Sequence, residues 1–149
     1  MTKRRLLTFI LGLVLIGTIA FLAFSLYHKS RPQTKYLTPP KTSVKQIKAR
    51  ADLIIEGKVL RQEAKQLKVK KVTYTAYQVK VTKVIRGKQE ARYLTIYKAG
   101  FRDPKSGDYV LYRNDSVPLV NHRYRFYLTK VANNYLANSP HTMLALPNN

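Results

Sequence analysis

The chain has 149 residues, with 28 lysines and arginines against 7 aspartates and glutamates, a formal net charge of +21 at pH 7. It contains no cysteine and no tryptophan. The lack of cysteine excludes disulfides, thiol catalysis, zinc–thiolate sites and lipidation at a lipobox cysteine. The length allows one small core, and the excess of positive charge favours anionic partners.

Residues 6–27 contain no charged side chain. As a helix rising about 1.5 Å per residue, this stretch extends roughly 33 Å, enough to cross a hydrocarbon layer about 30 Å thick. Apolar regions of signal peptides run about 7 to 15 residues, so we expect an uncleaved transmembrane anchor. A signal cleaved after Ser25 is the alternative. Tyr27 is expected at the level of the outer headgroups.

Basic residues flank the expected span on both sides, and the positive-inside rule uses their distribution to orient it. The first cluster is tighter and lies beside the α-amino group, so residues 1–5 are expected to form a cytoplasmic tail. We therefore expect a single-pass protein of the cell membrane, with its carboxy-terminal domain on the outer face. The clusters are Lys3, Arg4 and Arg5 before the span, and Lys29, Arg31 and Lys35 after it.

A polar stretch over residues 28–41 contains three prolines. Proline fixes φ and disfavours helix in the residue before it, so this stretch is expected to be an extended linker. Ser43 and Gln46 then form a capping box ahead of apolar residues at helical spacing. These signals predict one short amphipathic helix that ends near Asp52 and opens a domain over residues 42–149.

The rest of the chain alternates apolar and polar residues, which predicts antiparallel β-strands. Five or six strands over about 100 residues are enough for one core, so we expect a mostly β fold: a small five- to six-stranded antiparallel OB-like barrel. Residues 61–68 are expected to be a charged connection, and residues 103–108 a turn inside a longer loop. The strands are expected at residues 53–60, 69–85, 93–98, 109–112, 123–131 and 135–137.

Two irregularities are expected within these strands. Gly57 indicates a bend or bulge in the first strand, and a slip of the alternation at Lys83 indicates a bulge that returns Val84 or Ile85 to the core. The apolar residues on alternating strand faces are expected to share one core: Leu53, Ile55, Val59, Val79, Val81, Leu94, Ile96, Phe126 and Leu128.

Three segments resemble, in this order, a group of small extracytoplasmic barrel proteins of Gram-positive bacteria. They read ADLIIEGKV at residues 51–59, YQVKVTKVIRGK at residues 77–88 and RYRFYL at residues 123–128. The group is similar in strand pattern to the netrin and metalloproteinase-inhibitor type of OB-like barrel, so the resemblance implies that fold over roughly residues 44–138. The inhibitory mechanism is not implied, because those inhibitors place an amino-terminal cysteine on the zinc of their target.

The charge is the strongest indication of function. Without the three cytoplasmic basic residues, 25 lysines and arginines face 7 acidic residues, a net charge of +18 on the expected outer portion. Such a field favours membrane lipid headgroups, phosphate-bearing wall polymers or nucleic acid. Nucleic acid is disfavoured because it is scarce outside the cell. A solvated basic surface without a specific ligand remains an open alternative.

Basic and aromatic residues interleave on the predicted strands. OB-type barrels bind single strands of nucleic acid on such faces, by stacking bases on aromatic rings beside a cationic groove. Strands also favour tyrosine for packing alone. The residues expected to share one exposed face and to bind a ligand are Lys80, Lys83, Tyr97, Lys98, Arg123, Arg125 and Tyr127.

The sequence predicts no catalytic residue, no metal site and no cofactor. Asp103, Ser106, Asp108 and Asp115 offer oxygens for calcium, but their spacing matches no EF-hand loop, and a turn-forming role is favoured. We therefore expect a binding or interaction module at an anionic cell envelope rather than an enzyme. An accessory subunit that docks on another membrane protein is the main alternative.

Overall fold

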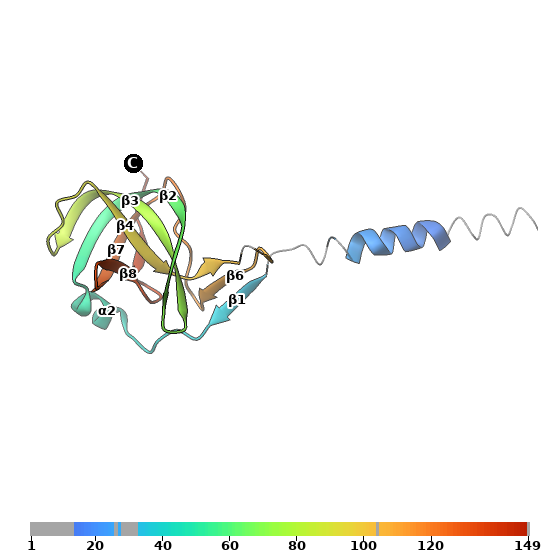
Figure 1. The fold of residues 1–149 in the computed structure, drawn as a ribbon, viewed down its shortest axis with the longest axis horizontal. Coiled ribbons are helices and arrows are strands. Elements are labelled where there is room, and N and C mark those ends of the chain that lie inside the picture. Colours follow the sequence, from blue (N-terminus) through green and yellow to red (C-terminus); the bar gives the residue numbers. More distant parts are fainter. Residues whose placement is uncertain (1–13, 26, 28–32, 104, 149) are drawn as a thin grey trace, which may run out of the picture. The chain divides into compact units, whose positions relative to one another are not determined.

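The computed structural model describes residues 14–25, 27, 33–103 and 105–148 (Figure 1). The chain divides into two units, Met1–Gln33 and Thr34–Asn149, each of which is described by itself. In the first unit residues 14–25 are helical. Among the described residues, no helix has both the length and the apolar character needed to cross a bilayer. The expected tail and the first part of the expected anchor, residues 1–13, lie outside the described residues.

The second unit is mostly β, as the alternating sequence predicts. Its boundary at Thr34 differs from the expected boundary at residue 42, because a strand forms within the predicted linker. The elements are β1 (Thr34–Leu37), α2 (Val44–Arg50), β2 (Leu53–Val69), β3 (Val72–Arg86), β4 (Tyr93–Ala99), β5 (Phe101–Arg102), β6 (Tyr109–Tyr112), β7 (Arg123–Val131), β8 (Asn134–Ala137) and β9 (Met143–Ala145).

Five strands form a closed ring in the order β2-β3-β4-β8-β7, because β7 also pairs with β2. All neighbours in the ring are antiparallel except β4 and β8, which are parallel. Strand β9 adds to the other edge of β7, beside β8. A second sheet has the order β1-β6-β5, with β1 and β6 parallel and β5 and β6 antiparallel (Figure 1).

The capping box at the start of α2 is confirmed. The Gln46 backbone N–H donates to Ser43 Oγ at 3.2 Å, and the Ser43 N–H donates to Gln46 Oε1 at 3.0 Å. At the other end, Arg86 of β3 donates to the carbonyl oxygens of Lys48 and Ala49 at 3.0 and 3.2 Å. These bonds satisfy carbonyl groups that a helix end leaves unpaired, and they tie α2 to the ring.

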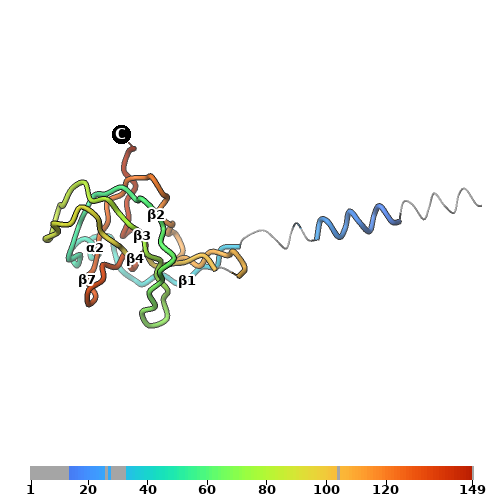
Figure 2. Tube along the Cα trace, turned by 45° about the horizontal axis from the view of Figure 1, so that its top comes forward, coloured from blue at the N-terminus to red at the C-terminus, as the bar shows by residue number. Residues whose placement is uncertain are grey.

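The long hairpin between β2 and β3 corrects the prediction of a charged connection at residues 61–68. Strand β2 continues through these residues to Val69, which lies opposite Val72, so that the turn contains only Lys70 and Lys71. The hairpin tip projects away from the ring (Figure 2). A strand can carry many charges when one face is solvated. On the other face, Leu67, Val69 and Val72 pack against a buried cluster.

Both predicted irregularities occur in the β2–β3 pairing. The register shifts between Glu56 and Gly57 and again between Ile54 and Ile55. A side chain at Gly57 would place its Cβ 2.8 Å from the Lys80 carbonyl oxygen, so this close approach requires glycine. The bulge does not return an apolar residue to the core: Val84 and Ile85 are 37 and 43% exposed.

The predicted core is confirmed inside the ring. Seven of the nine expected residues are fully buried there, whereas Val81 and Leu94 are partly buried and pack against the same cluster. Tyr77, Tyr124 and Ala137 join it on the inward faces of β3, β7 and β8. The core therefore follows from the strand alternation, in which every second residue faces inward.

Two further clusters cover parts of the outer face of the ring. Under α2, Ile47 and Ala51 pack against Ile54 and Tyr127. The second cluster, which we call the outer tyrosine cluster, lies under the β1-β6-β5 sheet and the β2–β3 hairpin. Its buried members are Tyr74, Ala76, Tyr97, Ala99, Tyr112 and Leu136.

The first prediction concerns the core inside the ring. Phe126 is fully buried on β7, so Phe126→Ala should lower the free energy of unfolding by about 3–5 kcal/mol through lost contacts and a cavity. Val131 ends the same strand and is 41% exposed, and Val131→Ala should cost less than about 1 kcal/mol. Urea unfolding of residues 34–149 measures both. Equal losses would show that β7 is not anchored through Phe126.

Candidate anion-binding surface

Outside the two covered regions, outward side chains of four adjacent strands are partly or fully exposed. Lys80 of β3 lies opposite Tyr93 of β4 on one side and opposite Lys58 of β2 on the other. Lys58 in turn lies opposite Arg123 of β7. Because directly opposed residues have Cβ atoms about 4.5–5.5 Å apart, these four residues form a row across the sheet. Three of the four side chains are cationic.

A second row lies beside the first. Glu56 of β2 is opposite Lys83 of β3 and also opposite Arg125 of β7. Alternation places Glu56 and Lys58 on the same face, since both neighbour inward residues. We call the cations of the two rows the basic band. It consists of Lys58, Lys80, Lys83, Arg123 and Arg125.

The single carboxylate in these two rows, Glu56, is held by one arginine. Its Oε1 accepts hydrogen bonds from Arg125 Nε at 3.1 Å and Nη2 at 2.6 Å. The hydrogen bonds from Arg125, together with the charges of Lys83 and Arg123, lower the pKa of Glu56. Glu56 therefore stays ionised and orients Arg125, and it offsets one positive charge of the basic band.

The other cations of the basic band have no such partner. Within the part of the chain that the structure describes, no carboxylate lies within ion-pair distance of Lys58, Lys80, Lys83 or Arg123. Like charges opposite each other on neighbouring strands repel, which costs stability. An anion bound to this surface would relieve that repulsion.

Three of the seven predicted ligand-binding residues are not on the exposed face, and the prediction of one shared face is wrong for them. Tyr97 is 3% exposed in the outer tyrosine cluster, and Tyr127 is buried under α2. Lys98 points to the inner side of the ring and is also buried. The period of a strand separates its two faces but does not reveal which outward residues another element covers.

The structure brings the other four predicted residues together in the basic band: Lys80, Lys83, Arg123 and Arg125. Sequence analysis missed Lys58 and the exposed ring of Tyr93. The alternation of the first strand places Gly57 and Val59 inward, and it therefore already predicts an outward position for Lys58.

Lys98 instead forms a buried ion pair with Asp115. The Lys98 Nζ donates to Asp115 Oδ2, with side chains only 1 and 5% exposed. The other carboxylate oxygen accepts from the Ser116 backbone N–H at 2.9 Å. Burial lowers the pKa of Lys98, and the neighbouring charge of Asp115 counteracts that shift. The pair connects β4 to the loop after β6, so its role is structural.

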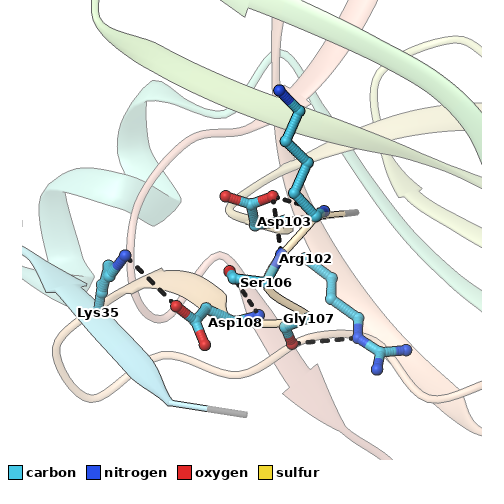
Figure 3. A network of polar contacts seen from close by, with 7 residues as sticks. Lys35, Arg102, Asp103, Ser106, Gly107 and Asp108 are labelled. Atoms are coloured by element: carbon cyan, nitrogen blue, oxygen red, sulfur yellow. Dashed lines mark hydrogen bonds and ion pairs between the residues drawn. The ribbon is translucent and has the colours of Figure 1, made fainter. Parts of the chain in front are cut away.

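The expected turn-forming role of Asp103, Ser106 and Asp108 is confirmed (Figure 3). Asp103 Oδ1 accepts from the Lys105 backbone N–H at 2.8 Å, and the Asp108 N–H donates to Ser106 Oγ at 3.2 Å. The Asp108 carboxylate forms an ion pair with Lys35 of β1 at 3.3 Å. These contacts shape the turn between β5 and β6 and fasten β1 to it.

Among the described residues, no three histidine, aspartate or glutamate side chains are grouped so that they could hold a metal ion. The comparisons with protein-family models, with curated proteins and with solved structures return no match for the chain. The geometry of the chain is therefore the basis for any functional proposal.

The second prediction tests the buried pair. Asp115→Asn leaves the Lys98 ammonium buried without a counter-charge and should cost about 3–5 kcal/mol of stability at neutral pH. Without Asp115, burial favours the neutral amine, so we expect Lys98 to release its proton in the folded variant, whereas the unfolded chain still binds that proton. The deficit should therefore shrink as pH rises toward the ordinary lysine pKa of about 10.4.

Thermal and urea unfolding between neutral and alkaline pH measures this deficit. Glu63→Gln is the matched control, because Glu63 pairs at 4.0 Å with Arg61, whose side chain is 66% exposed. An exposed pair is worth about 0–1 kcal/mol. A deficit in Asp115→Asn that does not change with pH would contradict a buried, proton-releasing Lys98.

Proposed function

We propose that the chain is a membrane-anchored, extracytoplasmic binding module that holds anionic groups of the cell envelope on the basic band. The observation that carries the proposal is the row formed by Lys58, Lys80 and Arg123, three neighbouring cations without a carboxylate partner among the described residues. Each such lysine or arginine contributes about 1 kcal/mol to binding at an anionic lipid surface. Lipid headgroups and phosphate-bearing wall polymers both supply the required charge.

The strand order supports assigning the second unit to the OB-like barrels. An OB barrel is a partly open, five-stranded Greek-key barrel. The ring here also has five strands, and around it β8 lies between β4 and β7, although β7 precedes β8 in the chain. The long β2–β3 hairpin occupies the place of the first connection in such a barrel. The proposal for the fold rests on this order and not on any solved relative.

The anchor is proposed on sequence grounds. Residues 6–27 carry no charge, and the helical residues 14–25 lie within them. The basic cluster at Lys3, Arg4 and Arg5 favours a cytoplasmic amino terminus and a second unit at the outer face. A domain tethered there would encounter anionic lipid and wall polymer at high local concentration.

The outer surface of the ring favours this function over binding of single-stranded nucleic acid. OB barrels bind oligonucleotides on the face of their second and third strands, which correspond to β3 and β4. Here Tyr74 and Tyr97 of that face are buried under the chain's own β2–β3 hairpin and small sheet. Their rings are therefore not available for base stacking.

An accessory subunit would instead need an exposed apolar patch of several hundred Å². The large exposed apolar residues include two neighbouring pairs: Val84 and Ile85 on β3, and Leu119 and Val120 in the loop between β6 and β7. The cations Lys80, Lys58 and Arg123 are continuous across three strands, β3, β2 and β7, and they favour an anionic partner over an apolar one.

The third prediction tests the basic band. Residues 34–149 should bind vesicles that contain anionic lipid at low salt and lose affinity steeply as ionic strength rises. Lys58→Gln with Lys80→Gln should weaken binding by about 2 kcal/mol, roughly 30-fold, because two contact charges are removed. Sedimentation of vesicles over a salt series measures the affinity, and circular dichroism checks that the variants fold.

The matched control changes Lys68 and Lys71 to glutamine. Both side chains are exposed near the tip of the β2–β3 hairpin, away from the basic band, and removing them alters net charge by the same amount. We expect less than about a threefold loss. Equal losses of affinity in the two double variants would contradict the proposal and would show that binding depends only on total charge.

The fourth prediction tests topology. Since the chain has no cysteine, one introduced cysteine is its only thiol. Lys68→Cys should react with a membrane-impermeant maleimide on intact cells, whereas Thr2→Cys should react only after the membrane is permeabilised. The reverse pattern would contradict the orientation. If the mass of the recovered protein corresponds to a chain that begins at Leu26, residues 6–25 belong to a cleaved signal.

A further inference from the structure

A cavity of about 410 Å³ opens on the outer face of the ring, between the two covering layers. Arg50 at the end of α2, Tyr74 of β3, Tyr112 of β6, Tyr127 of β7 and Ser139 after β8 line it. Its volume lies within the range of roughly 300–1,000 Å³ that is usual for small-molecule sites. None of these residues belongs to the basic band, so this is a separate place on the molecule.

Several hydroxyl groups that line the cavity have no protein partner. Within the described residues, no hydrogen bond involves the hydroxyls of Tyr74, Tyr112 or Ser139, although Ser139 is only 4% exposed. No side-chain polar atom that is fully buried in the described part of the chain lacks a partner, so these three oxygens are accessible to solvent, and their residues line the cavity. A ligand in the cavity could therefore donate hydrogen bonds to these hydroxyls and accept hydrogen bonds from them.

The tyrosine hydroxyls remain donors at physiological pH. Burial raises the pKa of Tyr74 to about 12, and the neighbouring Tyr112 adds to the shift. Burial, together with the charge of Asp115, also raises the pKa of Tyr112. Neutral hydroxyls both donate and accept, so the cavity suits a ligand with hydroxyl groups of its own.

One cationic side chain, that of Arg50, lines the cavity. Arg50 is in the last turn of α2, and among the described residues no carboxylate or carbonyl group pairs with its guanidinium. A guanidinium binds phosphate or carboxylate through two parallel hydrogen bonds.

We propose that this cavity binds a sugar phosphate, with the phosphate on Arg50 and the sugar hydroxyls at the hydroxyls of Tyr74, Tyr112 and Ser139. Inorganic phosphate alone would not engage the hydroxyls of Tyr74, Tyr112 and Ser139, and a neutral sugar would not engage the charge of Arg50. The proposal rests on the proposed envelope function only for the source of the ligand, which is either a free sugar phosphate or a sugar-phosphate unit of a wall polymer.

The test uses the full chain purified in non-ionic detergent, with glucose 1-phosphate as the probe. Calorimetry measures binding, and quenching of tyrosine emission offers a second readout because the chain has no tryptophan. Arg50→Gln should weaken binding at least about tenfold, through loss of hydrogen bonds to a charged group. Tyr74→Phe removes one hydroxyl and should weaken binding about threefold or more.

Lys45→Gln is the matched control, since Lys45 lies on the same helix but does not line the cavity, and it should leave the affinity unchanged. Glucose and inorganic phosphate should each bind at least about tenfold more weakly than glucose 1-phosphate. If inorganic phosphate binds as tightly, or if Arg50→Gln and Lys45→Gln lose equally, the proposal is overturned.

Two further arms assign the source and separate this proposal from the basic band. The methyl phosphodiester of glucose 1-phosphate resembles a polymer unit, so tight binding of the diester indicates the wall polymer, and tight binding of the monoester alone indicates a free sugar phosphate. Lys58→Gln with Lys80→Gln should leave glucose 1-phosphate binding unchanged. Its loss in that variant would place the site on the basic band and overturn the cavity proposal.

Discussion

The second unit depends on strand β2 being paired along both of its edges. From Leu53 to Lys58 it pairs with β7, and from Ile54 to Lys58 it also pairs with β3. This double pairing closes the ring, encloses the apolar faces and leaves no free edge at that point. It also requires the close approach at Gly57, where the Lys80 carbonyl leaves no space for a side chain. The central position of β2 is why Glu56 and Lys58 have charged neighbours on two sides.

The outer face of the ring is divided by what covers it. Helix α2 protects Ile54 and Tyr127, and the small sheet with the β2–β3 hairpin protects the outer tyrosine cluster. The basic band is the part that neither layer covers, whereas the 410 Å³ cavity lies where the two layers fail to meet. Two places of different chemistry thus result from one arrangement. The first presents charge on an open surface, and the second presents hydroxyls and aromatic rings in a recess.

Local patterns predicted much of this fold. The capping box predicts the start of α2, and alternation predicts β7 at its observed bounds and the core around Phe126. Strands β1 and β9 were missed because each is short and is defined by partners distant in the sequence, Tyr109 for Thr34 and Tyr124 for Ala145. For the same reason, the covering of Tyr97 and the pairing of Lys98 with Asp115 have no local signal.

Strand β1 is the first element after the unit boundary at Thr34, and it is held in parallel to β6 over four residue pairs. Any tension carried along the chain from its amino-terminal side therefore reaches this short strand before the ring. Its ties are the pairing with β6, the ion pair between Lys35 and Asp108, and the packing of Leu37. These contacts are fewer than those that hold the closed ring together. Under load, β1 would therefore detach before the ring opens, and the core would stay folded.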